Sequence, residues 1–201
     1  PHEERLMTAA SDLTVKETAQ LAGVTASVVE KALETKVLKA KEKKARRRGG
    51  ATRFLPVNAV IYLAAIKAAK LTDLPVKYKK ALWAQLKALE VGTLKPVEFA
   101  PMAILKVDEL VSEPYAKALR YVNARDTHIV SNPEILGGTP VITNTRITVY
   151  SVLARLEDGE SLDEIAGDYP GVPREAFEAA AIYAKANPLM GRPRRPWHAA
   201  A

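Results

Sequence analysis

The chain has 201 residues, of which 48% are hydrophobic and 26% charged, so it is long enough for one large or two small globular domains. It contains no cysteine and no apolar run approaching the roughly 20 residues of a membrane span, which excludes disulfides and cysteine-based metal sites and favours a cytoplasmic protein. The net charge is +7, and its source is local: between Lys36 and Arg53, nine basic residues accompany a single acid, Glu42.

The first helix signal lies near the N-terminus. Thr14 is followed three residues later by Glu17, the spacing of a capping box, and apolar residues then recur at helical intervals. Gly23 ends this helix, and Thr25 is placed to cap a second one. Two short helices joined by a glycine-containing turn of about three residues predict a helix-turn-helix.

A basic hairpin is expected after these two helices. The pair Val37 and Leu38, the basic run, Gly49 and Gly50, and the extended segment 51–55 follow one another. Two extended pieces around a glycine pair indicate a β-hairpin, with the basic residues at its tip. Pro56 suits the first position of the next helix.

The middle of the chain gives weaker signals. Residues 73–80 are expected to turn the chain, 81–89 to form an amphipathic helix, and 97–107 to form short strands broken by Pro101. Residues 108–125 predict a helix that is kinked at Pro114.

The last third begins with short apolar pieces between turn residues and continues with three helices. They are expected over 149–157, after Ser161 with Glu164 completing a second capping box, and over 174–187. Two of these helices around a short turn form a second possible helix-turn-helix. The expected fold is therefore mainly α, with two helix-turn-helix-like domains, the first of them winged, and small β elements.

The segment 128–188 resembles a family of small bacterial domains, DUF433. The resemblance is carried by Ile129, Asn132, Pro133, Ile135, Gly137, Gly138, Pro140, Val141, Ile142, Thr145, Arg146, Ile147, Val149, Leu156, Gly159, Ser161, Glu164, Ile165, Tyr169, Pro170 and Ala184. The family usually has Gly where this chain has Asn144, and Pro where it has Thr148. Since Asn tolerates a left-handed backbone, we expect the turn to be retained.

This resemblance implies a helical, helix-turn-helix-like domain and a role as an antitoxin of the VapB type, whose partners are often PIN-like ribonuclease toxins. Longer members carry a DNA-binding-like region in front and a Gly-Arg-Pro tail, which Gly191, Arg192 and Pro193 match. The front of the chain separately resembles winged helix-turn-helix proteins of the MerR or excisionase type.

Residues expected to bind DNA come from the second helix and the hairpin. Hydroxyl and ammonium groups on the helix can reach bases or phosphates, and the basic wing can neutralise phosphates with release of counterions. The expected contacts are Thr25, Ser27, Lys31, Lys43, Lys44, Arg46, Arg47, Arg48 and Arg53. The alternatives are that the helix residues only cap and solubilise it, and that the basic run is solvated without a partner.

A toxin-binding role is expected for the tail, which is rich in Arg and Pro and cannot form a core alone. Its expected contacts are Arg192, Arg194, Arg195 and Trp197, since Arg can enter an acidic nuclease site; the alternative is a frayed terminus. For Arg146, stabilising the turn through backbone carbonyls and contacting DNA or a partner both remain open.

An enzymatic activity is not expected. The three histidines, His2, His128 and His198, show no metal-ligand spacing, and the paired acids lie at predicted helix ends, where they serve as caps. We expect no cofactor, no metal and no membrane partner.

The expected organisation has five parts. Residues 1–7 are non-native or a disordered start, 8–72 form the winged helix-turn-helix, 73–127 link or dimerise, 128–188 form the DUF433-like domain, and 189–201 form a flexible basic tail. The expected function is a homodimeric antitoxin that binds operator DNA, neutralises a PIN-like ribonuclease toxin and represses its own operon. The alternatives are a stand-alone transcription regulator and a scaffold that binds RNA or protein.

Overall fold

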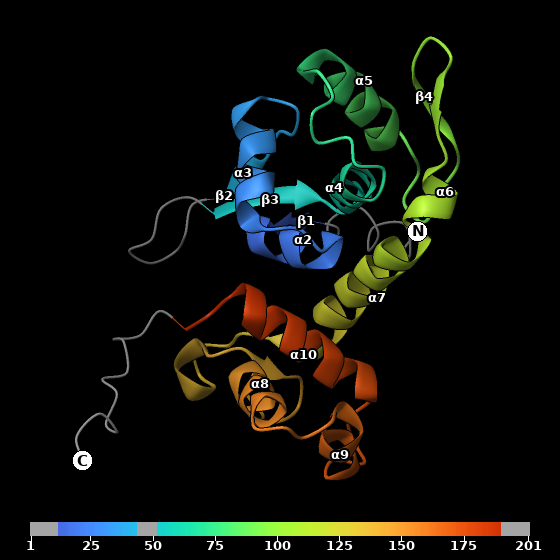
Figure 1. The fold of residues 1–201 in the computed structure, drawn as a ribbon. Coiled ribbons are helices and arrows are strands. Elements are labelled where there is room, and N and C mark those ends of the chain that lie inside the picture. The colour runs from blue at the N-terminus through green and yellow to red at the C-terminus, as the bar shows by residue number, and fades with distance from the viewer. Residues whose placement is uncertain (1–11, 44–51, 190–201) are drawn as a thin grey trace, which may run out of the picture.

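The computed structural model describes residues 12–43 and 52–189, and it is mainly α-helical with small antiparallel sheets, as expected. In order, the first elements are β1 (Asp12–Thr14), α2 (Val15–Ala22), α3 (Ala26–Glu34), β2 (Lys41–Lys43), β3 (Thr52–Pro56) and α4 (Asn58–Ala68). The three strands form one antiparallel sheet in the order β1-β3-β2, against which α2 lies, and α4 packs on α2 (Figure 1). Strand β3 corresponds to the expected extended segment 51–55. The other strand, β2, lies within the basic run, whereas Val37 and Leu38 are buried in the core and form no strand.

The helices of this first part follow their local signals. The capping box is formed: Glu17 donates its backbone N–H to the Thr14 hydroxyl at 3.2 Å, and Thr14 donates its own to the Glu17 carboxylate at 2.7 Å. Helix α4 is buried on all sides from Asn58 to Ile66, so it is a central core helix rather than an amphipathic one. The prediction that Pro56 opens α4 was wrong, because Pro56 is the last residue of β3 and pairs with Asp12.

The middle segment contains α5 (Val76–Lys87), β4 (Val97–Ala100), β5 (Ala103–Leu105), α6 (Val107–Leu110) and α7 (Ser112–His128). Helix α5 begins directly after Pro75 and therefore earlier than expected, because its first turn is exposed and lacks the apolar pattern that begins at Leu82. The expected kink at Pro114 was also wrong. The break lies at Val111, and Pro114 occupies the first turn of α7, where its missing N–H needs no partner.

The C-terminal part contains β6 (Ile129–Val130), the 3-10 turn η1 (Leu136–Gly138), β7 (Val141–Ile142), α8 (Val149–Glu157), α9 (Leu162–Gly167) and α10 (Arg174–Ala186). The strands β6 and β7 pair antiparallel, and the three helices occur where the sequence predicted them. The second capping box is also formed, with the Glu164 N–H bonded to the Ser161 hydroxyl at 3.2 Å.

Two hydrophobic cores share helix α10. The first core is built from the elements β1 to α7, and the second from β7 and α8 to α10. Ala179 and Ile182 of α10 are buried in the first core, whereas Phe177 and Ala180 are buried in the second. Figure 1 shows α7 and α10 lying between the two groups of helices. The segment 73–127 thus packs into the first core instead of only linking two bodies.

A buried carboxylate fixes α2 against α7. Glu17 is 2% exposed, and the Tyr121 hydroxyl of α7 donates to its Oε1 at 2.5 Å, while Arg125 Nη1 approaches the same oxygen at 3.5 Å. Arg125 also donates to the backbone carbonyl of Asp12 at 3.2 Å. Burial and the negative charge of Glu17 raise the pKa of Tyr121, so this hydroxyl stays a donor well above neutral pH.

Replacement of Tyr121 by Phe should lower the free energy of unfolding by about 1–3 kcal/mol, because Glu17 loses a donor while remaining buried. Urea denaturation of the full chain at neutral pH measures this loss. Tyr78 is the matched control: its hydroxyl forms no hydrogen bond in the described part of the chain, so Tyr78→Phe should cost less than about 0.5 kcal/mol. Equal effects of the two substitutions would contradict the role assigned to Tyr121.

Candidate nucleic-acid interface

The turn between α2 and α3 is fixed by a glycine and a lysine. Gly23 has φ 65° and ψ 30°, a left-handed conformation that favours glycine, and the N–H of Val24 returns to the Ala19 carbonyl at 2.9 Å. Lys67 of α4 donates to the Gly23 carbonyl at 2.5 Å. The orientation of α3 relative to α2 therefore depends on contacts from a third helix.

Helix α3 presents a polar outer surface. Thr25, Ser27 and Lys31 are exposed, whereas Val29 and Ala32 are buried against the core. Thr25 occupies the predicted cap position, but its side chain makes no capping hydrogen bond. Within residues 12–43 and 52–189, none of these three exposed side chains forms a hydrogen bond or ion pair, so their donors and acceptors face solvent.

The hairpin strands carry basic side chains that are partly neutralised. Lys41 and Lys43 lie 3.5 Å and 3.7 Å from the Asp12 carboxylate of β1, and Lys43 also lies over the Phe54 ring. Arg53 of β3 forms an ion pair with Glu30 of α3 at 2.6 Å. Arg53, predicted to contact DNA, thus connects the hairpin to α3.

Several predicted site residues lie outside the described residues. They are Lys44, Arg46, Arg47 and Arg48 in the hairpin, and Arg192, Arg194, Arg195 and Trp197 in the tail. The flanking strands are described, and their last register pair is Lys43 with Thr52.

The turn before α8 confirms the expectation made for Asn144, which has φ 61°. Thr148, in the place where the family usually has Pro, accepts the N–H of Ser151 at 3.0 Å and thereby caps α8. The turn itself is stabilised by the Thr145 hydroxyl, which donates to the Ile142 carbonyl at 2.7 Å and accepts the Ile147 N–H at 3.0 Å. Arg146 is exposed and forms none of these bonds, so the turn-stabilising interpretation of Arg146 was wrong.

The basic side chains of the second helix pair are mostly engaged. Arg155 forms ion pairs with Glu160 and Asp168, and Arg174 pairs with Asp163 at 2.5 Å and with Glu178 at 3.8 Å. Arg155 and Arg174 are thereby matched by nearby carboxylates, whereas Lys185 of α10 is exposed and forms no ion pair within residues 12–43 and 52–189.

Two features of the interface have no signal in the sequence. Lys67 is one of many lysines, and only the folded chain brings it to Gly23. Lys39 and Lys87 lie far apart in the sequence but line one groove beside the hairpin.

Within residues 12–43 and 52–189, no group of three or more His, Asp or Glu side chains is arranged to hold a metal ion, and no helix there is long and apolar enough to cross a bilayer.

Comparison with protein families identifies the C-terminal unit. Residues 129–184 match the family DUF433, described as a protein of unknown function, which confirms the resemblance inferred for 128–188. A curated relative, the uncharacterized protein y4eO of Sinorhizobium fredii, is 46% identical over 66 residues. That alignment covers 33% of this chain and 30% of y4eO, so the two proteins are alike over a minor part of their lengths.

Two solved structures are similar in part. A DUF433 member from Anabaena variabilis is 30% identical, with 55% of this chain and 88% of that one covered and a TM-score of 0.30. Rv2018 from Mycobacterium tuberculosis is 16% identical, with 84% and 96% covered and a TM-score of 0.34. At these TM-scores neither structure establishes a shared fold for the whole chain.

Substitution of Gly23 by Ala should destabilise the protein by about 1–2 kcal/mol, because the left-handed conformation is unfavourable for a residue with a Cβ. The added methyl would also lie 3.3 Å from Lys67 Nζ and so disturb the bond that fixes the turn. Thermal or urea unfolding checks this loss. Gly167→Ala is the control: its φ is ordinary and nothing lies within 4 Å, so it should be neutral or slightly stabilising.

Proposed function

We propose that this protein is a DNA-binding antitoxin of a type II toxin–antitoxin system, which neutralises a PIN-like ribonuclease toxin and represses its own operon. One observation carries the proposal: the Arg53–Glu30 ion pair connects the exposed helix α3 to the hairpin. In the sequence the residues that join the two strands of this hairpin are basic, and the same chain contains a DUF433-matching unit.

The DNA contact of this proposal has two parts. Helix α3 enters the major groove, where the Thr25 and Ser27 hydroxyls and the Lys31 ammonium reach bases or phosphates. The hairpin supplies phosphate contacts through Lys44, Arg46, Arg47 and Arg48, which lie between β2 and β3 in the sequence. The ion pair between Arg53 and Glu30 supports this arrangement, since it holds both parts to one another.

The toxin contact is assigned to the tail that follows α10. Its cations Arg192, Arg194 and Arg195 suit the acidic site of a metal-dependent nuclease, and Trp197 adds a large apolar side chain. The proposal includes a homodimer in the cytoplasm, because two copies of the DNA-binding unit match two half-sites of an operator.

Replacement of Arg46, Arg47 and Arg48 together by Ala should weaken binding to a duplex taken from upstream of the protein's own gene. Each lost phosphate contact reduces the slope of log affinity against log salt by about 0.9, so the triple variant should lower it by up to about 3. Fluorescence anisotropy at several salt concentrations measures both quantities. The charge-matched control is Lys117→Ala with Arg120→Ala and Lys185→Ala, which should leave the slope unchanged. An unchanged slope in the hairpin variant would remove the hairpin from the DNA contact.

Co-expression with the product of the neighbouring gene should yield a stable complex and suppress that product's toxicity. Replacement of Arg192, Arg194 and Arg195 by Glu should abolish both effects, because it reverses the charge offered to the nuclease site. Affinity purification and a growth assay measure them, with the exposed Lys80→Glu as a control outside the tail. If no nuclease associates while operator binding persists, the protein is a stand-alone transcription regulator. If neither the nuclease nor the operator binds, the scaffold alternative remains.

A further inference from the structure

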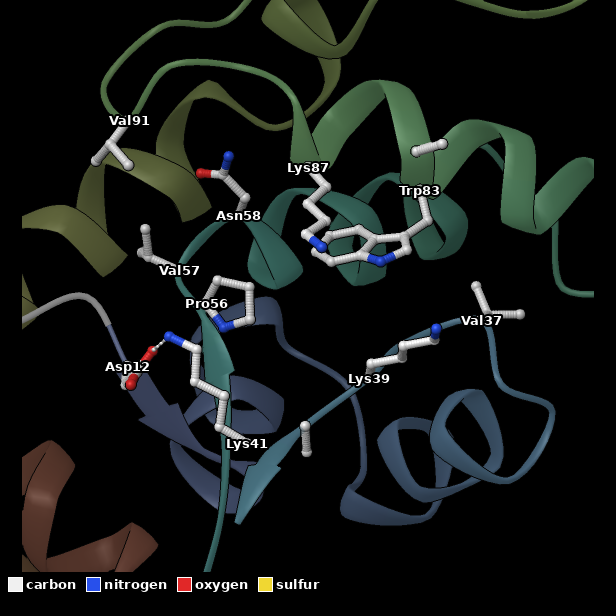
Figure 2. A pocket seen from close by; sticks show the side chains of 12 residues that line it. Asp12, Val37, Lys39, Lys41, Pro56, Val57, Asn58, Trp83, Lys87 and Val91 are labelled. Carbon is white, nitrogen blue, oxygen red and sulfur yellow. Dashed lines mark hydrogen bonds and ion pairs between the residues drawn. The ribbon is translucent and has the colours of Figure 1, made fainter. Parts of the chain in front are cut away.

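A groove lies between the base of the hairpin and helix α5. Its volume is about 670 Å³, within the range of small-molecule sites, and Figure 2 shows the side chains that line it. The hairpin side contributes Lys39, Lys41 and Pro56, and the α5 side contributes Trp83 and Lys87. The groove is therefore bounded by elements far apart in the sequence.

The floor of the groove is apolar and rigid. Val37 and Val57 are 3% and 1% exposed, and the Trp83 side chain is held edge-on against Tyr62, with ring centroids 6.0 Å apart. Trp83 is nearly buried, yet its indole N–H forms no hydrogen bond in residues 12–43 and 52–189 and is not a buried, unsatisfied group there. The indole N–H therefore keeps some exposure to solvent, and because Trp83 lines the groove we take this N–H as a donor for a ligand bound there.

The walls of the groove carry more basic than acidic side chains. Asp12 is the acid in the lining, and it is already engaged by Lys41 and Lys43. Lys39 and Lys87 are exposed, and neither forms an ion pair or hydrogen bond within the described ranges. Figure 2 shows both side chains among the residues that line the groove, Lys39 from the segment before β2 and Lys87 from α5.

The polar atoms of Asn58 in the same lining are already satisfied. Its amide donates to the carbonyls of Leu86 and Leu89 at 3.2 Å and 2.9 Å, and its Oδ1 accepts the Tyr115 hydroxyl at 2.9 Å. The available polar groups of the groove are thus donors: two ammonium groups and one indole N–H. Such a set is complementary to an anion and not to a cation.

We propose that this groove binds a small organic anion with an aromatic body. Its carboxylate, sulfonate or phosphate lies between Lys39 and Lys87 and accepts the Trp83 N–H, and its ring lies against Trp83 on the apolar side of the groove. A duplex fits the lysines but not the apolar floor, because its phosphate backbone offers no aromatic surface to cover Trp83. The site is separate from the α3 surface and does not depend on the DNA-binding proposal.

The experiment uses 8-anilinonaphthalene-1-sulfonate as the probe and its uncharged analogue N-phenyl-1-naphthylamine as the comparison. The full chain carries Trp197→Phe, so that Trp83 is the single tryptophan and its quenching reports binding in the groove. The sulfonate should quench Trp83 with a stoichiometry of one, and the uncharged analogue should bind more weakly.

Substitutions then assign the anion contact. Lys39→Gln and Lys87→Gln should each weaken sulfonate binding by about three- to fivefold, the size expected for a partly exposed charge pair, and the two together by on the order of tenfold. Lys80→Gln, on the same helix but outside the lining, is the matched control and should have no effect. Urea denaturation of each variant confirms that the fold is retained.

Three results would overturn the proposal: equal affinity for the charged and uncharged probes, unchanged affinity in the Lys39→Gln and Lys87→Gln double variant, or sulfonate binding without Trp83 quenching. A fourth is competition by DNA. If the upstream duplex displaces the sulfonate and the double variant binds that duplex more weakly, the groove is a phosphate contact of DNA. A protein that binds no DNA but retains the charge-dependent quenching loses only the DNA-binding proposal.

Discussion

The Glu17 carboxylate is the interaction on which the rest of the N-terminal part depends. Taking a carboxylate out of water costs several kcal/mol unless charges and hydrogen bonds replace the lost hydration. Here the donors come from the backbone of Thr14, from Tyr121 and from Arg125, so the group is satisfied only when β1, α2 and α7 are all in place. Since α2 positions α3, the surface assigned to DNA is held indirectly by Tyr121 and Arg125, which lie 104 and 108 positions from Glu17 along the chain.

Ion pairs with acidic side chains neutralise part of the positive charge on the hairpin strands. Lys41 and Lys43 are opposed by Asp12, and Arg53 is opposed by Glu30. The positive charges on the two described strands of the hairpin are therefore partly neutralised, and in the sequence four further basic residues, Lys44 and Arg46 to Arg48, lie between these strands. The same ion pairs connect β2 to β1 and β3 to α3. The carboxylates that neutralise part of the positive charge therefore also hold the base of the hairpin against the rest of the protein.

Local signals in the sequence predicted local structure well. Thr14 with Glu17 and Ser161 with Glu164 formed the two capping boxes, and Asn144 adopted the left-handed conformation. Strand β1 was missed, because three residues cannot show an alternating pattern. The Lys67 cap, the partners of Glu17 and the groove at Trp83 were not predictable either, since each joins residues that only the folded chain brings together. For Arg146 the residue type suggested a structural role that the hydroxyl of Thr145 fills.

Helix α10 makes the two halves of the protein difficult to separate, because it packs into both hydrophobic cores. One stripe of this helix, with Ala179 and Ile182, completes the core of the N-terminal part, and the opposite stripe, with Phe177 and Ala180, completes the core of the DUF433-matching part. A fragment ending before α10 would leave an apolar surface on α2 and α7 uncovered, and a fragment beginning after α7 would expose the other stripe. The DUF433-matching region of this chain therefore shares its last helix with the core of its neighbour, and separating the two parts would expose apolar surface on both.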